Sequence, residues 1–469
     1  MKKFIQSLEL RLSDLFLFIG FIAFAIFLIF GQEFMQQQDP TVVALPLWAA
    51  IIAFVVMVGC WGYYLYLELF VRKEYFNPYI AISFIALMML NIIAIFVQPK
   101  ESFVPNVVRF SSVDESLVGT TEIAHLVVTP THKFVFIGEL IGVASFIYIG
   151  LFVFSKRIKN IKFIEYLGYA LFGFLFVLII YSYITEYNQY IGFIKYVLGI
   201  DRIKDLTNEL TVKSFIIHRN AFGMCCMLGI IFCLINQSIK PRKWYYPLAA
   251  YFFISMIFSY CKTGILLSVA ILFIYFIYRL IVTFKEHKKR NTITLIAVGS
   301  VILIAFVVIG LPYLTKGKIF GKIYELIKEM TGEGQSIKTR SYIWDNCWLL
   351  LKDGWWLIGR GFGAVNLQLW PLNKVSHEEI VFPTHSAFMN MLAEGGIFLF
   401  LAYLAFLAYV VYVIIKSYKK SPELVVTVSL GVICFFLYSF IETIQYLMYV
   451  FLFPIFVIYF QKENNEVKN

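Results

Sequence analysis

Apolar segments long enough to cross a membrane recur along the chain, and short polar connections separate them. A hydrocarbon core of roughly 30 Å requires about 20 helical residues. The pair 244–260 and 263–283 is separated only by "SYCKTG", but the combined run is too long for a single crossing. The pattern predicts an all-α, polytopic integral membrane protein with about 12 transmembrane helices. These predicted spans lie near 14–30, 45–68, 78–97, 133–154, 163–184, 214–236, 244–260, 263–283, 293–314, 384–415, 422–440 and 443–460.

The distribution of Lys and Arg between the connections predicts the orientation of these helices. If the amino terminus is cytoplasmic, the internal connections carry 22 Lys and Arg residues, whereas the external connection 31–41 carries none. Short cytoplasmic loops hold the positive excess in membrane proteins. We therefore expect both termini in the cytoplasm. We attribute the formal net charge of +11 to topology rather than to nucleic-acid binding.

Three longer segments fall on the predicted outer face, near 98–132, 185–213 and 315–383. In the last of them, "TRSYIWDNCWLLLKDGWWLIGRGFG" predicts an amphipathic helix that ends at Gly354 and is followed by a glycine-rich turn. We expect one transmembrane domain, residues 1–469, with 315–383 as an external cap. An earlier helix in the cap, "KGKIFGKIYELIKEM", suits the membrane surface because lysines lie opposite an apolar face formed by Ile319, Ile323, Leu326 and Ile327.

Composition agrees with a membrane protein and excludes a soluble enzyme. Hydrophobic residues make up 60% of the chain and the mean hydropathy is +0.79, whereas soluble globular chains are about half apolar. "MKKFIQSLELRLSD" resembles the start of a signal peptide, but no small-residue cleavage site follows, so we expect a retained first helix. The seven cysteines show no CxxC or His/Cys ligand spacing, which predicts neither a disulfide framework nor a zinc site.

Cationic side chains gather at one predicted face of the membrane. In this topology, Arg219, Lys262 and His385 each lie at the outer end of a helix that runs from outside to inside, which is its amino terminus. Arg340 and Arg360 belong to the cap on the same side. Free N–H groups and the helix dipole favour anions at helix amino termini, and nearby cations strengthen this preference. The pattern predicts a site for a strongly anionic group such as a phosphate or pyrophosphate.

Other interpretations of these cations stay open. Lys262 and Arg360 could extend to the interface, as long cationic side chains do near the ends of spans. Arg219 lies several residues into its apolar run, where an ionisable residue is a functional hypothesis by default. An ion pair with Glu139 or Glu394 would also explain why an arginine lies within this apolar run.

His385 and Glu394 lie nine positions apart at the head of one long apolar helix. His385 could be a structural histidine with satisfied hydrogen bonds. Glu394 could orient a histidine, line a cavity or pair with an arginine, and the sequence does not choose between these roles.

Four motifs follow one another over residues 214–416: "SYCKTG" at the head of a span, "TRSYIW" and "IGRGFG" in the outer loop, and "THSAFMNMLAEGG" at the head of a later span. Their order and spacing resemble the O-antigen polymerase and ligase superfamily of lipid-linked glycan glycosyltransferases. The residues that fit the family's pattern are Arg340 and Trp344 in its Arg-x-x-x-Trp element, and His385, Glu394 and Gly396 in its last element.

The chain departs from this pattern at two positions. Lys262 stands where the family has an arginine, which keeps the charge but loses the bidentate fork. Ser386 stands where the family has an asparagine, so the role of that asparagine does not carry over to this chain.

The resemblance implies a metal-independent glycosyltransferase without a soluble cofactor. Such enzymes take a glycan joined through pyrophosphate to a polyprenyl lipid and transfer it to an acceptor hydroxyl. His385 is the candidate general base for that hydroxyl, with Glu394 in a supporting role. The anionic leaving group must be held and neutralised, and the candidates for this are Arg219, Lys262, Arg340 and Arg360.

We expect a polysaccharide polymerase of the inner (plasma) membrane, with its active site facing the periplasm or cell exterior. It would join polyprenyl-pyrophosphate-linked repeat units of an O-antigen, capsule or exopolysaccharide and release polyprenyl pyrophosphate. An O-antigen ligase that transfers the glycan to a lipid A-core acceptor is the alternative, and a lipid-linked oligosaccharide flippase is a more distant one. Expected partners are the lipid-linked donor, the glycan acceptor, the bilayer, and a chain-length regulator and flippase of the same pathway.

Overall fold

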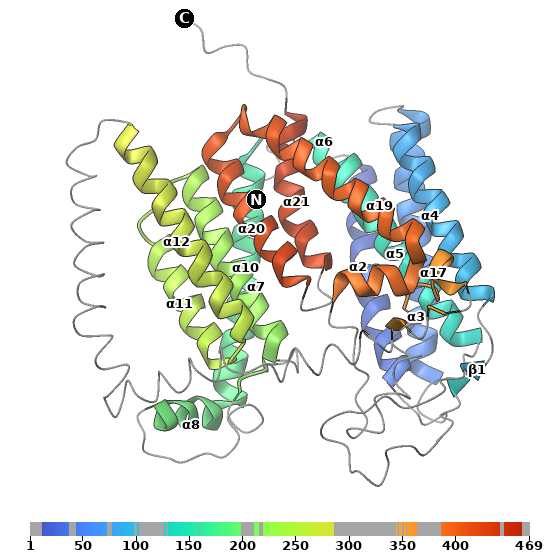
Figure 1. Cartoon of the computed structure of the whole chain (residues 1–469), viewed down its shortest axis with the longest axis horizontal. Helices are drawn as coiled ribbons and strands as arrows, with labels where there is room; N and C mark the ends of the chain where they lie inside the picture. Colours follow the sequence, from blue (N-terminus) through green and yellow to red (C-terminus); the bar gives the residue numbers. More distant parts are fainter. Residues whose placement is uncertain are drawn as a thin grey trace, which may run out of the picture. The chain divides into compact units, whose positions relative to one another are not determined.

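Helices dominate the part of the chain that the structure, a computed structural model, describes (Figure 1). These helices form two compact units. The first unit comprises Met1–Ile161, Gln335–Pro422 and Phe435–Asn469, and the second comprises Lys162–Gly334 and Glu423–Cys434. The described residues are 12–36, 44–72, 77–97, 101–102, 126–127, 130–158, 160–197, 211–214, 219–285, 344, 347–348, 351–352, 354–363, 386–440 and 445–461.

The first unit brings together helices from both ends of the sequence. Its helices α2 and α3 approach closely because Gly20 leaves room for the indole ring of Trp61, which would meet a Cβ atom at 2.3 Å. The same indole N–H donates to the carbonyl of Leu17 across 3.3 Å. The elements of this unit are α2 (Leu12–Gln36), α3 (Ala44–Leu65), η1 (Tyr66–Val71), α4 (Pro78–Val97), α5 (Pro130–Ile147), η3 (Tyr148–Phe154), α6 (Ser155–Arg157), α17 (Trp355–Ile358), α19 (Ala387–Tyr418) and α21 (Gln445–Phe460).

Buried charges join three elements of the first unit at the ends of their apolar runs. Arg157 of α6 makes two hydrogen bonds to the carboxylate of Asp14 in α2. Arg157 also lies 3.8 Å from Glu68 of η1, and Glu68 pairs with Arg72. A buried charge that loses its partner is strongly destabilising. This network of two acids and two arginines therefore fixes these helix ends against one another.

The second unit is built around α10 (Arg219–Ile239), which is largely buried and contacts α7, α11 and α12. Gly168 of α7 leaves space for the side chain of Asn236, which donates to the carbonyl of Glu165 across 3.3 Å. This hydrogen bond between Asn236 and Glu165 fixes the register of α7 against α10. The other helices of this unit are α7 (Lys162–Thr185), α8 (Tyr187–Val197), α11 (Tyr245–Phe258) and α12 (Lys262–Lys285), with most of α20 (Pro422–Tyr438).

The structure confirms a helical, polytopic membrane protein. Seven helices of the described residues are long and apolar enough to cross a membrane, and shorter apolar helices accompany them. Every predicted span except 293–314, which lies outside the described residues, coincides with a helix. The adjoining spans 244–260 and 263–283 are indeed separate helices, α11 and α12, with a turn at Tyr260. The count of twelve crossings and the orientation stay predictions.

One pair of short strands interrupts the helical pattern in the predicted outer segment 98–132. β1 (Glu101–Ser102) pairs antiparallel with β2 (Leu126–Val127), with Glu101 opposite Val127. The apolar and polar pattern did not predict this pair, because two residues are too few to show the alternation that marks a strand.

Candidate functional site

Residues 359–363 form a turn with three glycines, called the glycine turn, that lies against a break in α19 (Figure 1). This contact is the centre of the candidate site. At Gly396 the backbone of α19 leaves the helical region, with φ 63° and ψ −163°. The break leaves carbonyl groups in the preceding turn without the N–H partners that a continuous helix supplies. The carbonyl of Ala393 accepts from the Arg360 N–H at 2.8 Å, and that of Glu394 accepts from the Gly361 N–H at 2.7 Å. The motifs "GRGFG" and "AEGG" are therefore two halves of one structure.

Close backbone contact explains two of the glycines in these motifs. A Cβ atom on Gly359 would lie 2.4 Å from the carbonyl carbon and oxygen of Glu394. A Cβ atom on Gly396 would lie 2.3 Å from the carbonyl oxygen of Leu357. Both glycines also have positive φ, which side chains disfavour. Any larger residue at either position would push the turn away from α19.

The side chain of Glu394 adds a further bond to the turn. It is 3% exposed, and its Oε1 accepts from the Gly363 N–H at 2.9 Å. Asn390, one helical turn earlier, directs its side chain at the same carboxylate. Within the described part of the chain, Oε2 of Glu394 has no hydrogen-bond partner. Glu394 thus combines a positioning contact with a buried oxygen whose hydrogen-bonding capacity is unused among the described residues.

A second carboxylate, Glu139 of α5, approaches the same turn. A Cβ atom on Gly363 would lie 3.5 Å from Oε2 of Glu139. The carboxylates of Glu139 and Glu394 therefore both lie next to Gly363. Buried carboxylates need cations, protons or hydrogen-bond donors nearby. The pair makes this end of the first unit suited to holding positive charge against the turn.

Arg360 is oriented by two contacts in the turn. Its backbone N–H is bonded to α19, and its guanidinium lies over the Trp355 ring at 4.3 Å from the ring centroid. A planar guanidinium stacks on an aromatic face and still presents N–H groups at its edge. Arg360 is half-buried, so this cation is held in place rather than free to extend to the interface as an isolated side chain would be.

Ser386, which departs from the family pattern, has a structural role at the start of α19. It caps the helix, and its side chain accepts from the Met389 N–H at 3.5 Å. Serine is among the residues favoured at this position. The next residue, Ala387, donates its N–H to the carbonyl of Ser439 across 2.7 Å. The start of α19 is thus fixed next to His385, which itself lies outside the described residues.

Arg219 and Lys262 begin neighbouring helices in the second unit. They are the first residues of α10 and α12. The Cys261 thiol donates to the carbonyl of Asn220 across 3.9 Å, so the residues next to the two cations are in contact. Both positions are helix amino termini, as expected from the sequence. The alternative ion pair of Arg219 with a glutamate of the first unit stays a prediction.

The predicted amphipathic helix before the turn stays a prediction, because most of it lies outside the described residues. Trp344, Cys347 and Trp348 are helical, and Gly354, with φ 90°, directly precedes the short helix α17. Cys347 is fully buried, and burial raises the pKa of its thiol to about 12. Arg340 lies outside the described residues, so its predicted role stays a prediction.

Residues 247–404 match a family model described as O-Antigen ligase. The match contains α11, α12, α17, the glycine turn and the first half of α19. It confirms, for this region, the resemblance to the O-antigen polymerase and ligase superfamily that the motifs predicted. It supports a lipid-linked glycan polymerase or ligase role for a multi-pass membrane protein. The comparisons found no match among curated proteins and none among solved structures.

The sequence does not reveal that Glu139 lies at the candidate site. Its position in an apolar span indicates only a possible ion pair with Arg219. A single glutamate in an apolar span signals function in general terms, but its neighbour across the fold is not encoded locally. Only the packing of α5 beside the turn shows that Glu139 faces Gly363.

Proposed function

We propose that this protein is a polysaccharide polymerase that joins glycan repeat units carried on polyprenyl pyrophosphate. In the reaction, an acceptor hydroxyl attacks the anomeric carbon of the donor glycan, and a new glycosidic C–O bond forms. The bond between the anomeric carbon and the pyrophosphate oxygen breaks, and polyprenyl pyrophosphate leaves. The proton of the hydroxyl goes to a general base.

The docking of the glycine turn on the break in α19 is the observation that carries this proposal. It holds Arg360 and Glu394 in fixed positions within the region that matches the O-antigen ligase family. A reaction that expels pyrophosphate gains most from preorganised positive charge and donors near the leaving group. An arginine clamped by a backbone bond and an aromatic ring suits that need.

The proposed roles follow the chemistry of each side chain. His385 is the general base, since an imidazole accepts a proton near neutral pH. Arg340 binds the pyrophosphate as a planar fork, and Arg219, Lys262 and Arg360 add charge to the same anion. Glu394 is a supporting residue that holds the turn. The reaction needs no metal in this proposal, and it takes place at the periplasmic or outer face of the inner (plasma) membrane.

A reconstitution with defined donor tests the function. Purified protein in lipid vesicles, given a polyprenyl-pyrophosphate-linked repeat unit and no nucleotide sugar, should form lipid-linked products of two and more repeats, as judged by mass spectrometry. The same products should form in EDTA. Loss of activity in EDTA with recovery on adding a divalent cation would contradict metal independence.

Two other outcomes would reassign the protein within or outside its family. Transfer of the glycan only when a lipid A-core acceptor is added would identify a ligase. Movement of the donor across sealed vesicles without any change in glycan length would identify a flippase. The resemblance of residues 247–404 to the O-antigen ligase family is compatible with polymerase or ligase, and we favour the polymerase because the motifs are substituted at Lys262 and Ser386.

A further inference from the structure

Three lysine side chains lie over aromatic rings at one end of the first unit. They come from two segments that are far apart in the sequence, α6 and the end of α19, and both segments pack against α21. The distances from ammonium to ring centre are those of cation–π contacts. The pairs are Lys156 with Phe460 (4.8 Å), Lys416 with Tyr412 (5.7 Å), and Lys420 with Tyr459 (5.9 Å). Together with Lys419, the three lysines are called the lysine cluster.

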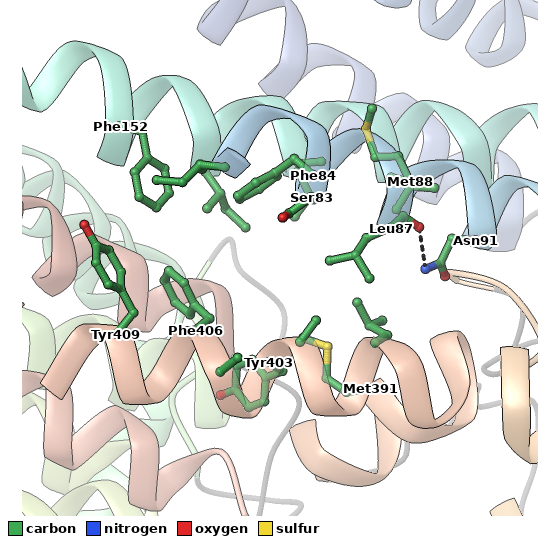
Figure 2. Close-up of a pocket in the computed structure, with 18 of the residues that line it drawn as sticks. Ser83, Phe84, Leu87, Met88, Asn91, Phe152, Met391, Tyr403, Phe406 and Tyr409 are labelled. Carbon is green, nitrogen blue, oxygen red and sulfur yellow. Dashed lines mark hydrogen bonds between the residues drawn. The ribbon is translucent and has the colours of Figure 1, made fainter. Parts of the chain in front are cut away.

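The rings beneath these lysines belong to one packed aromatic row. The Tyr412 and Tyr459 rings are 6.4 Å apart, and those of Tyr459 and Phe460 are 5.0 Å apart. From Tyr412 the row continues to Tyr409 at 6.1 Å, and from Tyr409 to Phe152 at 6.3 Å. Figure 2 shows Tyr409 and Phe152 next to one another at one end of an apolar pocket. The cluster therefore rests on rings that are held by packing.

Lysines three and four residues apart place like charges on one side of the end of α19. Residues 416–420 read "KSYKK" and contain no acidic residue. Lys419 keeps helical backbone angles, with φ −63° and ψ −27°, so Lys416, Lys419 and Lys420 share one helical face. Like charges at this spacing are destabilising. An anion bound at this face would relieve the repulsion between them.

Contacts within the protein use only part of this charge. Lys420 donates to the carbonyl of Tyr459 at 2.6 Å and to that of Gln461, so it caps the end of α21. The dipole of α19 also favours cations at its carboxyl end. Lys416 and Lys419 are exposed, and each ammonium has three N–H donors. The cluster thus presents cationic donors at the surface as well as contacts that hold the helix ends.

The position of the cluster along the helices matches the depth of lipid headgroups. Lys133–Arg157 and Ala387–Tyr418 are candidate membrane spans, and the cluster lies at the ends of both. The distribution of Lys and Arg predicts that these ends are cytoplasmic. Tyrosine rings are enriched at the membrane–water interface. Basic sites between helices on the cytoplasmic side bind anionic headgroups.

We propose that the lysine cluster binds the phosphate of an anionic phospholipid, such as phosphatidylglycerol, from the predicted cytoplasmic leaflet. This inference does not depend on the proposed function. A single lysine at the end of a span would report orientation alone, whereas here lysines from α6 and α19 converge on one row of rings. The rings favour a lipid over a soluble phosphate, because their apolar faces lie where acyl chains begin. The bound lipid joins the end of α6 to the end of α19.

Removal of two exposed charges tests the cluster. Lys416→Gln combined with Lys419→Gln leaves the contacts of Lys420 in place. The matched control is Lys240→Gln with Lys243→Gln, which removes two exposed lysines from another connection predicted to be cytoplasmic. The Kd for phosphatidylglycerol, measured by native mass spectrometry of the full chain, should rise about tenfold or more in the cluster variant and stay near wild type in the control. Equal changes in both variants would overturn the proposal.

A variant that keeps the charge separates binding from folding. Lys416→Arg with Lys419→Arg should bind phosphatidylglycerol nearly as well as wild type, because arginine also binds phosphate and stacks on aromatic rings. Loss of binding in this variant, with thermal stability unchanged, would contradict a role for the positive charge.

Cross-linking the unmodified protein identifies the ligand. Phosphatidylglycerol with a photoreactive headgroup should label peptides that contain α6 and residues 416–420. Excess unlabelled phosphatidylglycerol should suppress the labelling, and phosphatidylcholine, which has no net charge, should not. Suppression by inorganic phosphate would replace the lipid with a soluble anion and overturn the proposal. Suppression by polyprenyl phosphate at a lower concentration than phosphatidylglycerol would assign the site to a carrier lipid and would also overturn it.

Discussion

Gly363 donates its backbone N–H to the carboxylate of Glu394 across 2.9 Å. The carbonyl of the same glutamate accepts from the Gly361 N–H. Glu394 thus binds the turn through its main chain and its side chain, on both sides of Phe362. The placement of Arg360 depends on these bonds, because this arginine immediately precedes them in the same turn.

Replacement of Glu394 separates its positioning role from its charge. Glu394→Gln retains a carbonyl oxygen that can accept the Gly363 N–H, so thermal stability should stay close to wild type. Glu394→Ala removes the acceptor and should destabilise the protein by about 1–3 kcal/mol, the usual cost of leaving a buried N–H group without a hydrogen-bond partner. Transfer should fall more than tenfold in Glu394→Ala and less in Glu394→Gln, measured as kcat/KM with thermal melting in parallel. Equal inactivity of the two variants, both folded, would show that the carboxylate charge itself takes part in the chemistry.

Replacement of Gly396 by alanine should disrupt the packing of the glycine turn against α19. Gly396→Ala would bring Cβ within 2.3 Å of the Leu357 carbonyl and strain a residue at φ 63°. Such backbone strain costs about 1–3 kcal/mol, and the turn would move away from α19. Transfer should fall at least tenfold. Gly59→Ala in α3 is the control, because a Cβ there meets nothing within 4 Å. Comparable loss in both variants would mean that α-helical glycines matter here for a reason other than the turn.

The sequence predicted the helices well and the site only in part. Segments such as 78–97 are recognisable because a long apolar run is a local property, and α4 has those bounds. The glycine turn after Gly354 was also predicted, since positive φ favours glycine locally. The docking of Arg360 on Ala393 was not predictable, because it depends on a break in α19 that a hydrophobic pattern reads as continuous helix. Sequence alone likewise gave no reason to place Glu139 beside Gly363.

Labelling of thiols checks the predicted outer location of the cap. A cysteine introduced by Gly332→Cys should react with an impermeant thiol reagent in intact cells. The native Cys347 should give little background, because it is buried and its pKa is raised to about 12. At pH 8 roughly one such thiol in ten thousand is ionised, and its reactivity should rise with pH. Labelling of the new cysteine only after cells are broken would reverse the orientation.

The last prediction separates the roles of the cations from that of the histidine. If Arg340 binds pyrophosphate as a planar fork, Arg340→Lys should be nearly as damaging as Arg340→Ala, because lysine cannot form two parallel bonds. Lys262→Arg should be tolerated, since it restores the residue of the family pattern. Donor binding, measured with a non-hydrolysable donor, should weaken in both Arg340 variants.

His385→Ala should behave differently, because a general base acts on the acceptor hydroxyl. Its kcat should fall about 10²–10⁴-fold, the usual contribution of general acid–base catalysis, while donor binding stays near wild type. Wild-type protein and Lys262→Arg, prepared in the same vesicles, give the reference for insertion and folding. Loss of donor binding in a folded His385→Ala would make the histidine a pyrophosphate ligand. Full transfer in that variant would make it a structural residue, and the arginines alone would then account for the stabilisation of the leaving group.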